Sequence, residues 1–355
     1  MRLLFLAGDL TTTSGWGTYC NGFLARARAV HGDDAVACPP LASLDRSWRW
    51  RELGTPRDLA RLVRLARGSA LIHALVEPAA PLALALATLA RCRFVVSAHG
   101  TYADLAAYPR RQRAAIRFAF RRAAAILPVS SYTATVARRS FGDVPIAVVP
   151  GGFTPPPLRP QARTTTSEVP RLLSVGVLKE RKGFHTLLVA IARLHARGVR
   201  VACDIVGPIP SKAYRARLDG LVRDHDLGAD VSIRGVVSAD ELAALYAGAD
   251  LFVLASEHVG PAFEGLGLVY LEALSYGVPV IGSHDSGAID VIRDGVNGLL
   301  VTPGSPEALA SAIARILGDA SLAGAMRSVA PDSARGFTWD EVGTRMNAVW
   351  TAHAR

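Results

Sequence analysis

Two glutamates, Glu264 and Glu272, stand eight residues apart around a Gly-Leu-Gly turn, and an apolar helix is expected to begin between them. The first peptide N–H groups of a helix have no partner within the helix and present positive dipole to an anion. Carboxylates accept hydrogen bonds from hydroxyls. The segment therefore predicts a site for a ligand that carries hydroxyls and phosphates together, as a nucleotide sugar does.

Two further segments have the composition of a phosphate site. Arg181-Lys182-Gly183 follows a predicted strand and opens a predicted helix, where two cations can neutralise a diphosphate leaving group. A solvated charge pair at a helix start would have the same sequence. Gly15-Trp-Gly17 lies between the first predicted strand and a helix, where glycine lets the backbone approach a phosphate or sugar. An ordinary tight turn would also produce this pattern.

Two other patterns are less informative by themselves. His99-Gly100 ends a buried strand, and a single histidine there is compatible with an ordinary loop residue. Asp224-His-Asp226 matches an Asp-x-Asp metal motif, but it ends a predicted helix just before Gly228. We therefore expect no metal site there.

Short apolar runs alternate with helical patterns along the whole chain, which indicates parallel strands covered on both faces. This alternation is interrupted by the proline-rich segment 150–160, which is typical of a linker between domains. We expect an α/β protein with two doubly wound domains, 1–160 and 161–337, and a C-terminal helix, 338–355, that packs back toward the first domain. The predicted strands are 2–7, 70–76, 93–98, 125–129, 146–149, 171–177, 199–206, 230–234, 250–254, 278–281 and 298–301.

The composition indicates a globular protein, with 50% apolar and 20% charged residues. The four cysteines are far apart in the sequence, which argues against a zinc site or disulfide framework and favours the cytoplasm. Residues 1–8 contain too short an apolar run for a signal peptide. Residues 70–90 resemble a membrane span but contain Glu77 and two prolines, so a buried strand and a core helix are expected.

The positive charge belongs to the first half, where residues 1–165 hold 22 arginines against nine acidic residues. Arginine alternates with tryptophan over 46–51 and recurs at helical spacing at Arg57, Arg61 and Arg64 and again over 110–121. Basic amphipathic helices and tryptophan favour an anionic membrane surface. An arginine-rich soluble surface is the alternative. Nucleic-acid binding is not expected, because no aromatic platform or known motif is visible.

The chain resembles the retaining GT-B glycosyltransferases of family 4, most closely over 171–318. The segments that carry the resemblance are Ser174–Gly183, Asp204–Gly207, Ile233–Val236, Leu245–Ser256, Glu264–Glu272, Gly277–Ile281 and Asp294–Val301. The resemblance implies a GT-B fold, in which two Rossmann-like domains face each other across a cleft.

The resemblance also implies roles for the residues above. Glu264 would contact hydroxyls of the donor sugar, and Glu272 would accept from the ribose. The N–H groups of Leu266, Gly267 and Leu268 would face the donor phosphate and sugar, and Gly15 and Gly17 would lie in a loop facing the cleft. His99 would lie near the donor sugar and the attacking hydroxyl. Many relatives carry arginine where this chain has Val177, and Arg181, beside Lys182, is the expected substitute.

The function implied is transfer of a hexosyl group from a UDP- or GDP-sugar to a saccharide or lipid-linked acceptor, with retention and without metal or other cofactor. The alternatives are a nucleotide-sugar-binding relative without turnover, and a GT-B-like epimerase or phosphorylase. The expected location is the cytoplasm. The basic first half further suggests that the protein docks on the inner face of the plasma membrane.

Overall fold

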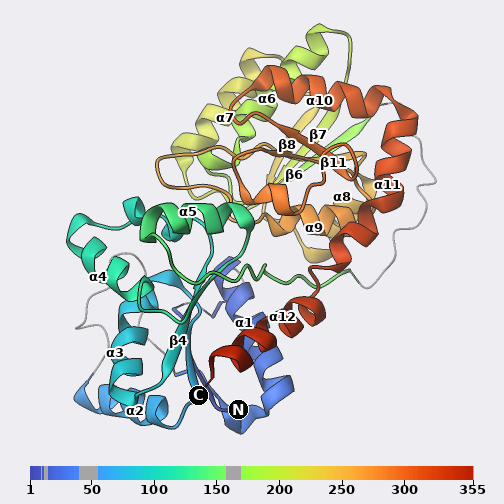
Figure 1. Cartoon of the computed structure of the whole chain (residues 1–355). Coiled ribbons are helices and arrows are strands. Elements are labelled where there is room, and N and C mark those ends of the chain that lie inside the picture. Colours follow the sequence, from blue (N-terminus) through green and yellow to red (C-terminus); the bar gives the residue numbers. More distant parts are fainter. Residues whose placement is uncertain (9, 12–14, 40–54, 157–168, 355) are drawn as a thin grey trace. The chain divides into compact units, whose positions relative to one another are not determined.

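The computed structural model describes residues 1–8, 10–11, 15–39, 55–156 and 169–354. The chain forms two compact units, unit 1 with residues 1–152 and 337–355 and unit 2 with residues 153–336 (Figure 1). The segment 46–51, rich in arginine and tryptophan, and residues 157–160 of the predicted linker lie outside the described residues.

Unit 1 is built on a parallel sheet with the strand order β2-β1-β3-β4-β5. Its apolar runs are fully buried in β1 and β3, as expected for strands covered on both faces. The prediction of a strand over 146–149 is wrong, because only Ile146 forms a bridge, to Ile126. The two-residue strand β2 was not predicted. The strands are β1 (Leu3–Leu6), β2 (Val36–Ala37), β3 (Leu71–Ala74), β4 (Arg93–Ala98) and β5 (Ala125–Pro128).

The helices of unit 1 follow the strands in alternation, and α2, α3 and α4 pack one against the next (Figure 1). They are α1 (Gly15–His31), η1 (Asp33–Ala35), α2 (Pro56–Arg67), η3 (Glu77–Ala79), α3 (Ala80–Ala90), η4 (Thr101–Ala103), η5 (Leu105–Ala107), α4 (Arg110–Phe120), α5 (Ser131–Phe141) and α12 (Trp339–His353). Residues 70–90 thus form a strand and a core helix, as predicted.

The C-terminal helix α12 completes the core of unit 1 and lies beside α1. Trp350 is fully buried, and its indole N–H donates to Nδ1 of His73 at 3.1 Å. The ring of Trp339 lies so close to Gly22 that a Cβ atom on Gly22 would come within 2.1 Å of it. Glycine in the middle of α1 therefore makes room for the first turn of α12.

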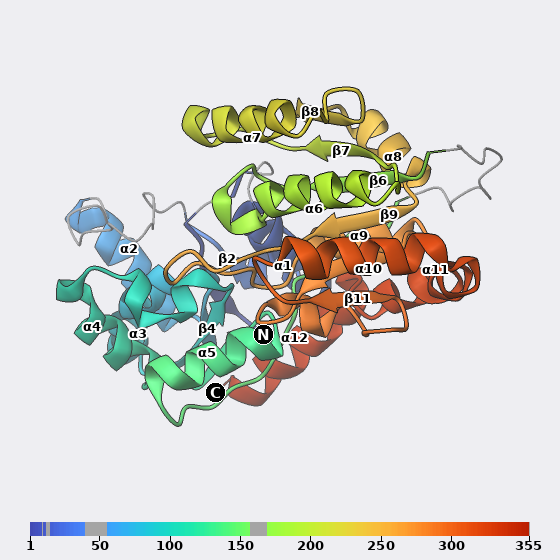
Figure 2. The same cartoon turned by 90° about the horizontal axis from the view of Figure 1, so that it is seen from above.

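Unit 2 is a six-stranded parallel sheet with the order β11-β10-β9-β6-β7-β8, with helices along it (Figure 2). The strands are β6 (Arg171–Val175), β7 (Ala202–Val206), β8 (Val231–Gly235), β9 (Leu251–Leu254), β10 (Val280–Ser283) and β11 (Gly298–Val301). The helices are η6 (Glu180–Lys182), α6 (Phe184–Ala196), α7 (Lys212–Asp224), α8 (Ala239–Gly248), α9 (Leu268–Ser275), η7 (Gly287–Asp290), α10 (Pro306–Gly318) and α11 (Ala320–Arg335).

The strand order defines one special position in each sheet. The chain leaves β6 toward β7 and β8 on one side and returns to β9 on the other, so the direction of winding reverses between β6 and β9. In unit 1 the same reversal falls between β1 and β3. Ligands of doubly wound sheets bind beyond the carboxyl ends of strands at such a reversal.

Among the described residues, no single helix is both long and apolar enough to cross a membrane. The pair α10 and α11 meets the length and composition test only together, and the two helices are bent by 92° at their junction.

Candidate active site

A cluster of opposite charges lies where the winding of unit 2 reverses. Lys182 ends η6, which follows β6, and Glu264 lies in the loop that follows the neighbouring strand β9. Lys182 Nζ binds Oε2 of Glu264, and Arg181 reaches the same oxygen at 3.1 Å. The hydroxyl of Ser256 donates to Oε2 at 3.3 Å. The structure thus brings together three residues that the sequence proposed separately for a diphosphate and a sugar, and it adds Ser256.

The two oxygens of the Glu264 carboxylate have different surroundings. Within the described residues, its side-chain hydrogen bonds and ion pairs all reach Oε2, while Oε1 accepts none. A carboxylate oxygen has lone pairs for more than one donor. Oε1 is therefore the oxygen that can accept from a ligand hydroxyl.

The charges of this cluster depend on one another because the cluster is buried. Burial by itself would raise the pKa of Glu264, but the attraction of Lys182 and then Arg181 outweighs it and lowers the pKa to about 2. Burial lowers the pKa of the Lys182 ammonium, and Glu264 opposes this. The side chains of Lys182 and Glu264 are only 9% and 10% exposed, so each needs the other, or a ligand charge, to stay ionised there.

The start of α9 lies directly after Glu264. Gly267 precedes the helix with φ of 84°, a left-handed conformation that favours glycine. The N–H of Gly287 donates to the carbonyl of Glu264 at 2.8 Å, which fixes the loop against η7. Leu266, Gly267 and Leu268 therefore occupy the positive end of a helix beside two cations, where an anion is favoured.

Glu272 lies further along α9 and has a protein partner that the sequence did not reveal. The hydroxyl of Tyr246, on α8, donates to Oε2 of Glu272 at 2.7 Å. Burial raises the pKa of Glu272, and the Tyr246 hydrogen bond partly offsets this. Tyr246 in turn stacks on Tyr276, with ring centroids 5.4 Å apart. Glu272 is thus held in a fixed orientation on a half-buried face.

The loop before Glu264 is held by several contacts at its start. Glu257 accepts from the hydroxyl of Thr186, at the start of α6, and its N–H donates to the carbonyl of Arg181 at 2.8 Å. His258 Nε2 donates to the carbonyl of Asp285 at 2.7 Å. These contacts hold the start of the loop, Glu257 and His258, between the Arg181 turn and the segment before η7.

In unit 1, His99 follows β4 and is held as a neutral ring. Its Nε2 lies 2.7 Å from the carbonyl oxygen of Leu75, which can only accept, so Nε2 carries the proton. Burial lowers the pKa of His99 to about 4. The Tyr19 ring meets it edge-on, with centroids 4.0 Å apart. At neutral pH His99 can therefore offer Nδ1 as a hydrogen-bond acceptor, and it is not an acid.

The glycines of Gly15-Trp-Gly17 form the first turn of α1, so the expectation of a glycine-rich loop at these two positions is wrong. The helix begins earlier than the sequence indicated. Trp16 lies with its ring centroid 6.2 Å from that of His99 and 5.4 Å from that of Tyr102. The start of α1 and the end of β4 are therefore neighbours at the carboxyl edge of this sheet.

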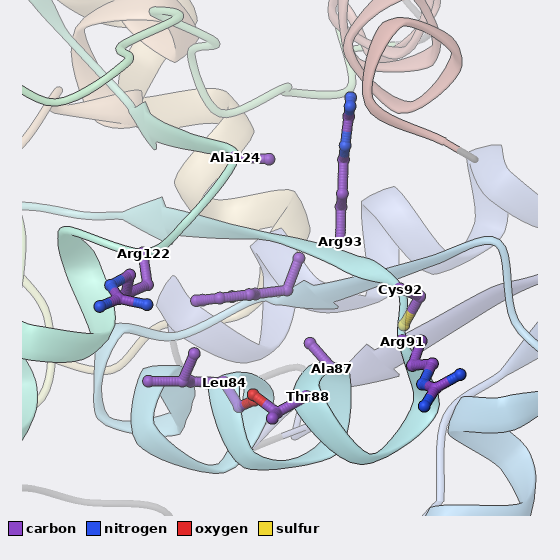
Figure 3. Close-up of a pocket in the computed structure, with 9 residues that line it drawn as sticks. Leu84, Ala87, Thr88, Arg91, Cys92, Arg93, Arg122 and Ala124 are labelled. Carbon is purple, nitrogen blue, oxygen red and sulfur yellow. The ribbon is translucent and has the colours of Figure 1, made fainter.

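A pocket of about 430 Å³ lies at the opposite edge of the same sheet, where β4 begins. It is lined by Arg91, Arg93 and Arg122, whose side chains point in different directions (Figure 3). The Arg122 guanidinium stacks on Phe118, 4.9 Å from the ring centroid. These cations do not converge on one point, so the pocket lacks the geometry of a phosphate site.

Comparison with known proteins defines the class. The family described as "Glycosyl transferases group 1" matches residues 160–332, and "Glycosyltransferase Family 4" matches residues 21–155. The structure of the Anabaena protein Alr3699/HepE in complex with UDP and glucose has a TM-score of 0.77, with 20% identity, covering 99% of this chain and 100% of that one. The fold is that of the two-domain, Rossmann-like GT-B proteins, and the chain belongs to the group 1 glycosyltransferases.

Two curated relatives are called GDP-mannose-dependent alpha-(1-6)-phosphatidylinositol monomannoside mannosyltransferase. The one from Mycobacterium tuberculosis (strain CDC 1551 / Oshkosh) is 31% identical over 61% of this chain and 59% of its own length. The one from Mycolicibacterium smegmatis is 33% identical over 70% of this chain and 68% of its own length. The chain thus spans about three fifths to two thirds of these relatives.

Proposed function

We propose that this chain is a retaining glycosyltransferase that moves a hexosyl group from a UDP- or GDP-sugar to a hydroxyl of a saccharide or lipid-linked acceptor. The observation that carries the proposal is the Glu264, Lys182 and Arg181 cluster at the winding reversal of unit 2. Family membership supports the reaction type. The relatives named for GDP-mannose and the fold neighbour with bound UDP support the two nucleotides.

In the proposed reaction the cluster changes partners. The donor diphosphate replaces Glu264 as the counter-charge of Lys182 and Arg181, and the N-terminus of α9 adds N–H groups to it. Charge that develops on the leaving diphosphate is then met by preorganised donors, which is how such sites lower a barrier. Two cations and a helix N-terminus provide the positive counter-charge for the diphosphate without a metal ion.

The carboxylates would then bind hydroxyls. Oε1 of Glu264 accepts from the donor sugar, and Glu272 accepts from the ribose. Retention fits attack from the same face as the leaving group, with the leaving phosphate taking the acceptor proton. His99 orients a hydroxyl through Nδ1, since its neutral ring has no proton to give there.

A thermal-shift screen tests the donor assignment. UDP, GDP and ADP and their sugars are added to the chain and to two variants, Lys182→Ala and Lys179→Ala. Lys179 is the exposed lysine of the same turn and is the matched control. We expect the wild type and Lys179→Ala to be stabilised by UDP or GDP, and Lys182→Ala to lose the response. Equal responses of the two variants would remove Lys182 from the donor site.

Nucleotide release on adding acceptor extracts tests turnover. The Glu264→Gln variant should release far less nucleotide than the wild type. Nucleotide binding by the wild type without release against any lipid or saccharide extract would instead favour the binding-only relative. Interconversion of the nucleotide sugar without acceptor would favour the epimerase.

We further propose that unit 1 docks on the inner face of the plasma membrane from the cytoplasm. Arg57, Arg61 and Arg64 are exposed on α2, whose opposite side buries Leu62 and Ala66. Phe118, on α4, is 55% exposed. Exposed arginines are attracted to an anionic bilayer, and this attraction weakens with salt.

Liposome flotation at low salt tests the docking. The wild type should float with anionic vesicles and stay behind with neutral ones, and the triple variant Arg57→Gln, Arg61→Gln, Arg64→Gln should lose most recovery. A control with the same loss of charge in unit 2, at Arg193, Arg197 and Arg200, should still float. Equal recovery of wild type with neutral and anionic vesicles would refute docking.

A further inference from the structure

Glu77 is a buried acid that the proposed reaction does not use. It begins η3, in the connection that follows β3, and its side chain is fully buried. The connection after β3 lies at the winding reversal of unit 1, the edge of the sheet where a ligand is expected. Burying a carboxyl group is costly unless its hydrogen bonds compensate, so its contacts point to its role.

Those contacts are to the turn that carries His99. Oε1 of Glu77 accepts from the peptide N–H of His99 at 2.6 Å. Gly100 has φ of 140° and ψ of −107°, a conformation open to glycine, and the turn therefore needs an external partner to hold it.

The ring of His99 is held from the same segment. The carbonyl oxygen of Leu75, two residues before Glu77, accepts a hydrogen bond from Nε2 of His99 at 2.7 Å. The connection between β3 and η3 thus binds His99 twice, once through the backbone and once through the imidazole. Movement of the turn relative to this connection would change where Nδ1 points.

We propose that Glu77 is a positioning residue for His99: its ionised carboxylate binds the peptide N–H of His99 and so fixes the ring at the substrate hydroxyl. The last part rests on the proposed function, because it requires His99 to meet a substrate. A hydrogen bond to a charged acceptor is stronger than one to a neutral acceptor, so loss of the charge loosens the turn.

The surroundings make this contact sensitive to pH. Burial raises the pKa of Glu77 to about 7, although the backbone N–H groups oppose the rise. Oε2 is buried and has no hydrogen-bond partner among the described residues, so it is the oxygen that takes the proton. The contact is complete above neutral pH and weakens as the pH falls.

Four titratable groups around Glu77 keep their charge over the same range. Burial raises the pKa of Tyr19 and of Tyr108 and lowers the pKa of His99 and of His73, so all four are neutral near pH 7. Tyr19 and Tyr108 interact electrostatically with Glu77, and His73, His99 and Tyr102 lie on β3, after β4 and on η4. Helix α1 also carries Cys20, Arg26, Arg28 and His31.

NMR of the full chain with ¹⁵N-labelled histidine tests the proposal without any substrate. The His99 signals are assigned with His99→Gln and followed from pH 5.5 to 8.5. We expect a ring that stays neutral and keeps its Nε2 proton, yet shifts with a midpoint near pH 7. Glu77→Gln, which has nearly the same shape, should abolish this step.

Ser69→Ala is the control for general effects on unit 1. Ser69 is buried before β3, away from His99, and bonds the Leu65 carbonyl at 2.8 Å. This variant should keep the step. A step that persists in Glu77→Gln, or that is absent from the wild type, would overturn the proposal.

Enzyme kinetics provide a second test of the proposal. We expect Glu77→Gln to lower kcat about 10- to 100-fold with little change in donor KM, the scale of a small misplacement of a reacting group. The acid limb of the wild-type profile should disappear in this variant. An unchanged kcat and an unchanged acid limb would overturn the positioning role. Absence of turnover in the wild type would refute only the proposed function. The pH-dependent step in the His99 signals would then decide whether Glu77 positions His99.

Discussion

Replacing Glu264 with glutamine should destabilise unit 2 strongly in the absence of donor. The pKa of Glu264 lies at about 2 instead of 4.5, which corresponds to about 3 kcal/mol of stabilisation by the folded surroundings at neutral pH. The variant loses this stabilisation of the carboxylate, and the buried Lys182 loses the negative charge of its partner. Breaking one side of a buried ion pair typically costs about 3–5 kcal/mol, which agrees in size.

The assay is thermal unfolding of the full chain with and without nucleotide. For a unit of this size, about 3 kcal/mol lowers Tm by roughly 6–12 °C. Glu307→Gln is the matched control, because Glu307 also binds two cations, Arg193 and Arg197, but is 55% exposed. We expect its Tm to stay near that of the wild type, since exposed pairs contribute little.

Nucleotide provides the decisive comparison. If UDP or GDP replaces Glu264 as the counter-charge, it should raise the Tm of Glu264→Gln by more than it raises the Tm of the wild type. A Glu264→Gln variant as stable as Glu307→Gln, or one that nucleotide stabilises less than the wild type, would refute the reasoning that Glu264 neutralises the donor site.

Three further outcomes follow from the structure. Because the folded-state pKa of Glu264 is lowered, its stabilisation is complete above pH 4.5 and is lost as the pH falls toward 2; acid titration of Tm should show this loss in the wild type and not in Glu264→Gln. Glu272→Ala should weaken nucleotide binding measured by calorimetry, and Tyr246→Phe should weaken it less, because the carboxylate remains. Gly22→Ala should lower the stability of unit 1 by about 1–3 kcal/mol, as overpacking does, and the added change Trp339→Ala should recover part of the loss in chemical denaturation.

Much of the fold could be predicted because parallel strands buried on both faces are continuous apolar runs. Leu251–Leu254 and Leu71–Ala74 are fully buried strands of this kind. The run at 146–149 looks the same in sequence, but it pairs through a single bridge. The two residues of β2 are too few to form a recognisable pattern. The segment Thr338-Trp-Asp-Glu341 predicts a capping box at the start of α12, but Thr338 makes no side-chain capping hydrogen bond there, so this prediction is wrong.

Residues of the candidate site could be identified from the sequence where their chemistry is local to one segment, but not where a contact depends on the packing of distant segments. The acids around Gly267 and the cations before Gly183 stand out by residue type. Tyr246 and Ser256 do not, because ordinary tyrosines and serines acquire these contacts only when α8 and β9 come into place. Glu77 stood out only as a charge inside an apolar segment. Its partner, the N–H of His99, is a backbone group that no side-chain pattern can reveal.

The structure shows where a guanidinium lies in a chain that has Val177 at a position where many relatives carry arginine. Arg181, four residues later, places Nη1 3.1 Å from Oε2 of Glu264 and 3.5 Å from the carbonyl of Phe263, so a guanidinium is present although its usual position holds valine. Arg181 and Lys182 differ in exposure, at 27% and 9% of their side chains. Lys182 therefore binds Glu264 from the buried side and Arg181 from the solvent side. Because both cations bind Oε2, Oε1 stays open to a hydroxyl. In the proposed reaction the same carboxylate would hold the cations before the donor binds and the sugar afterwards.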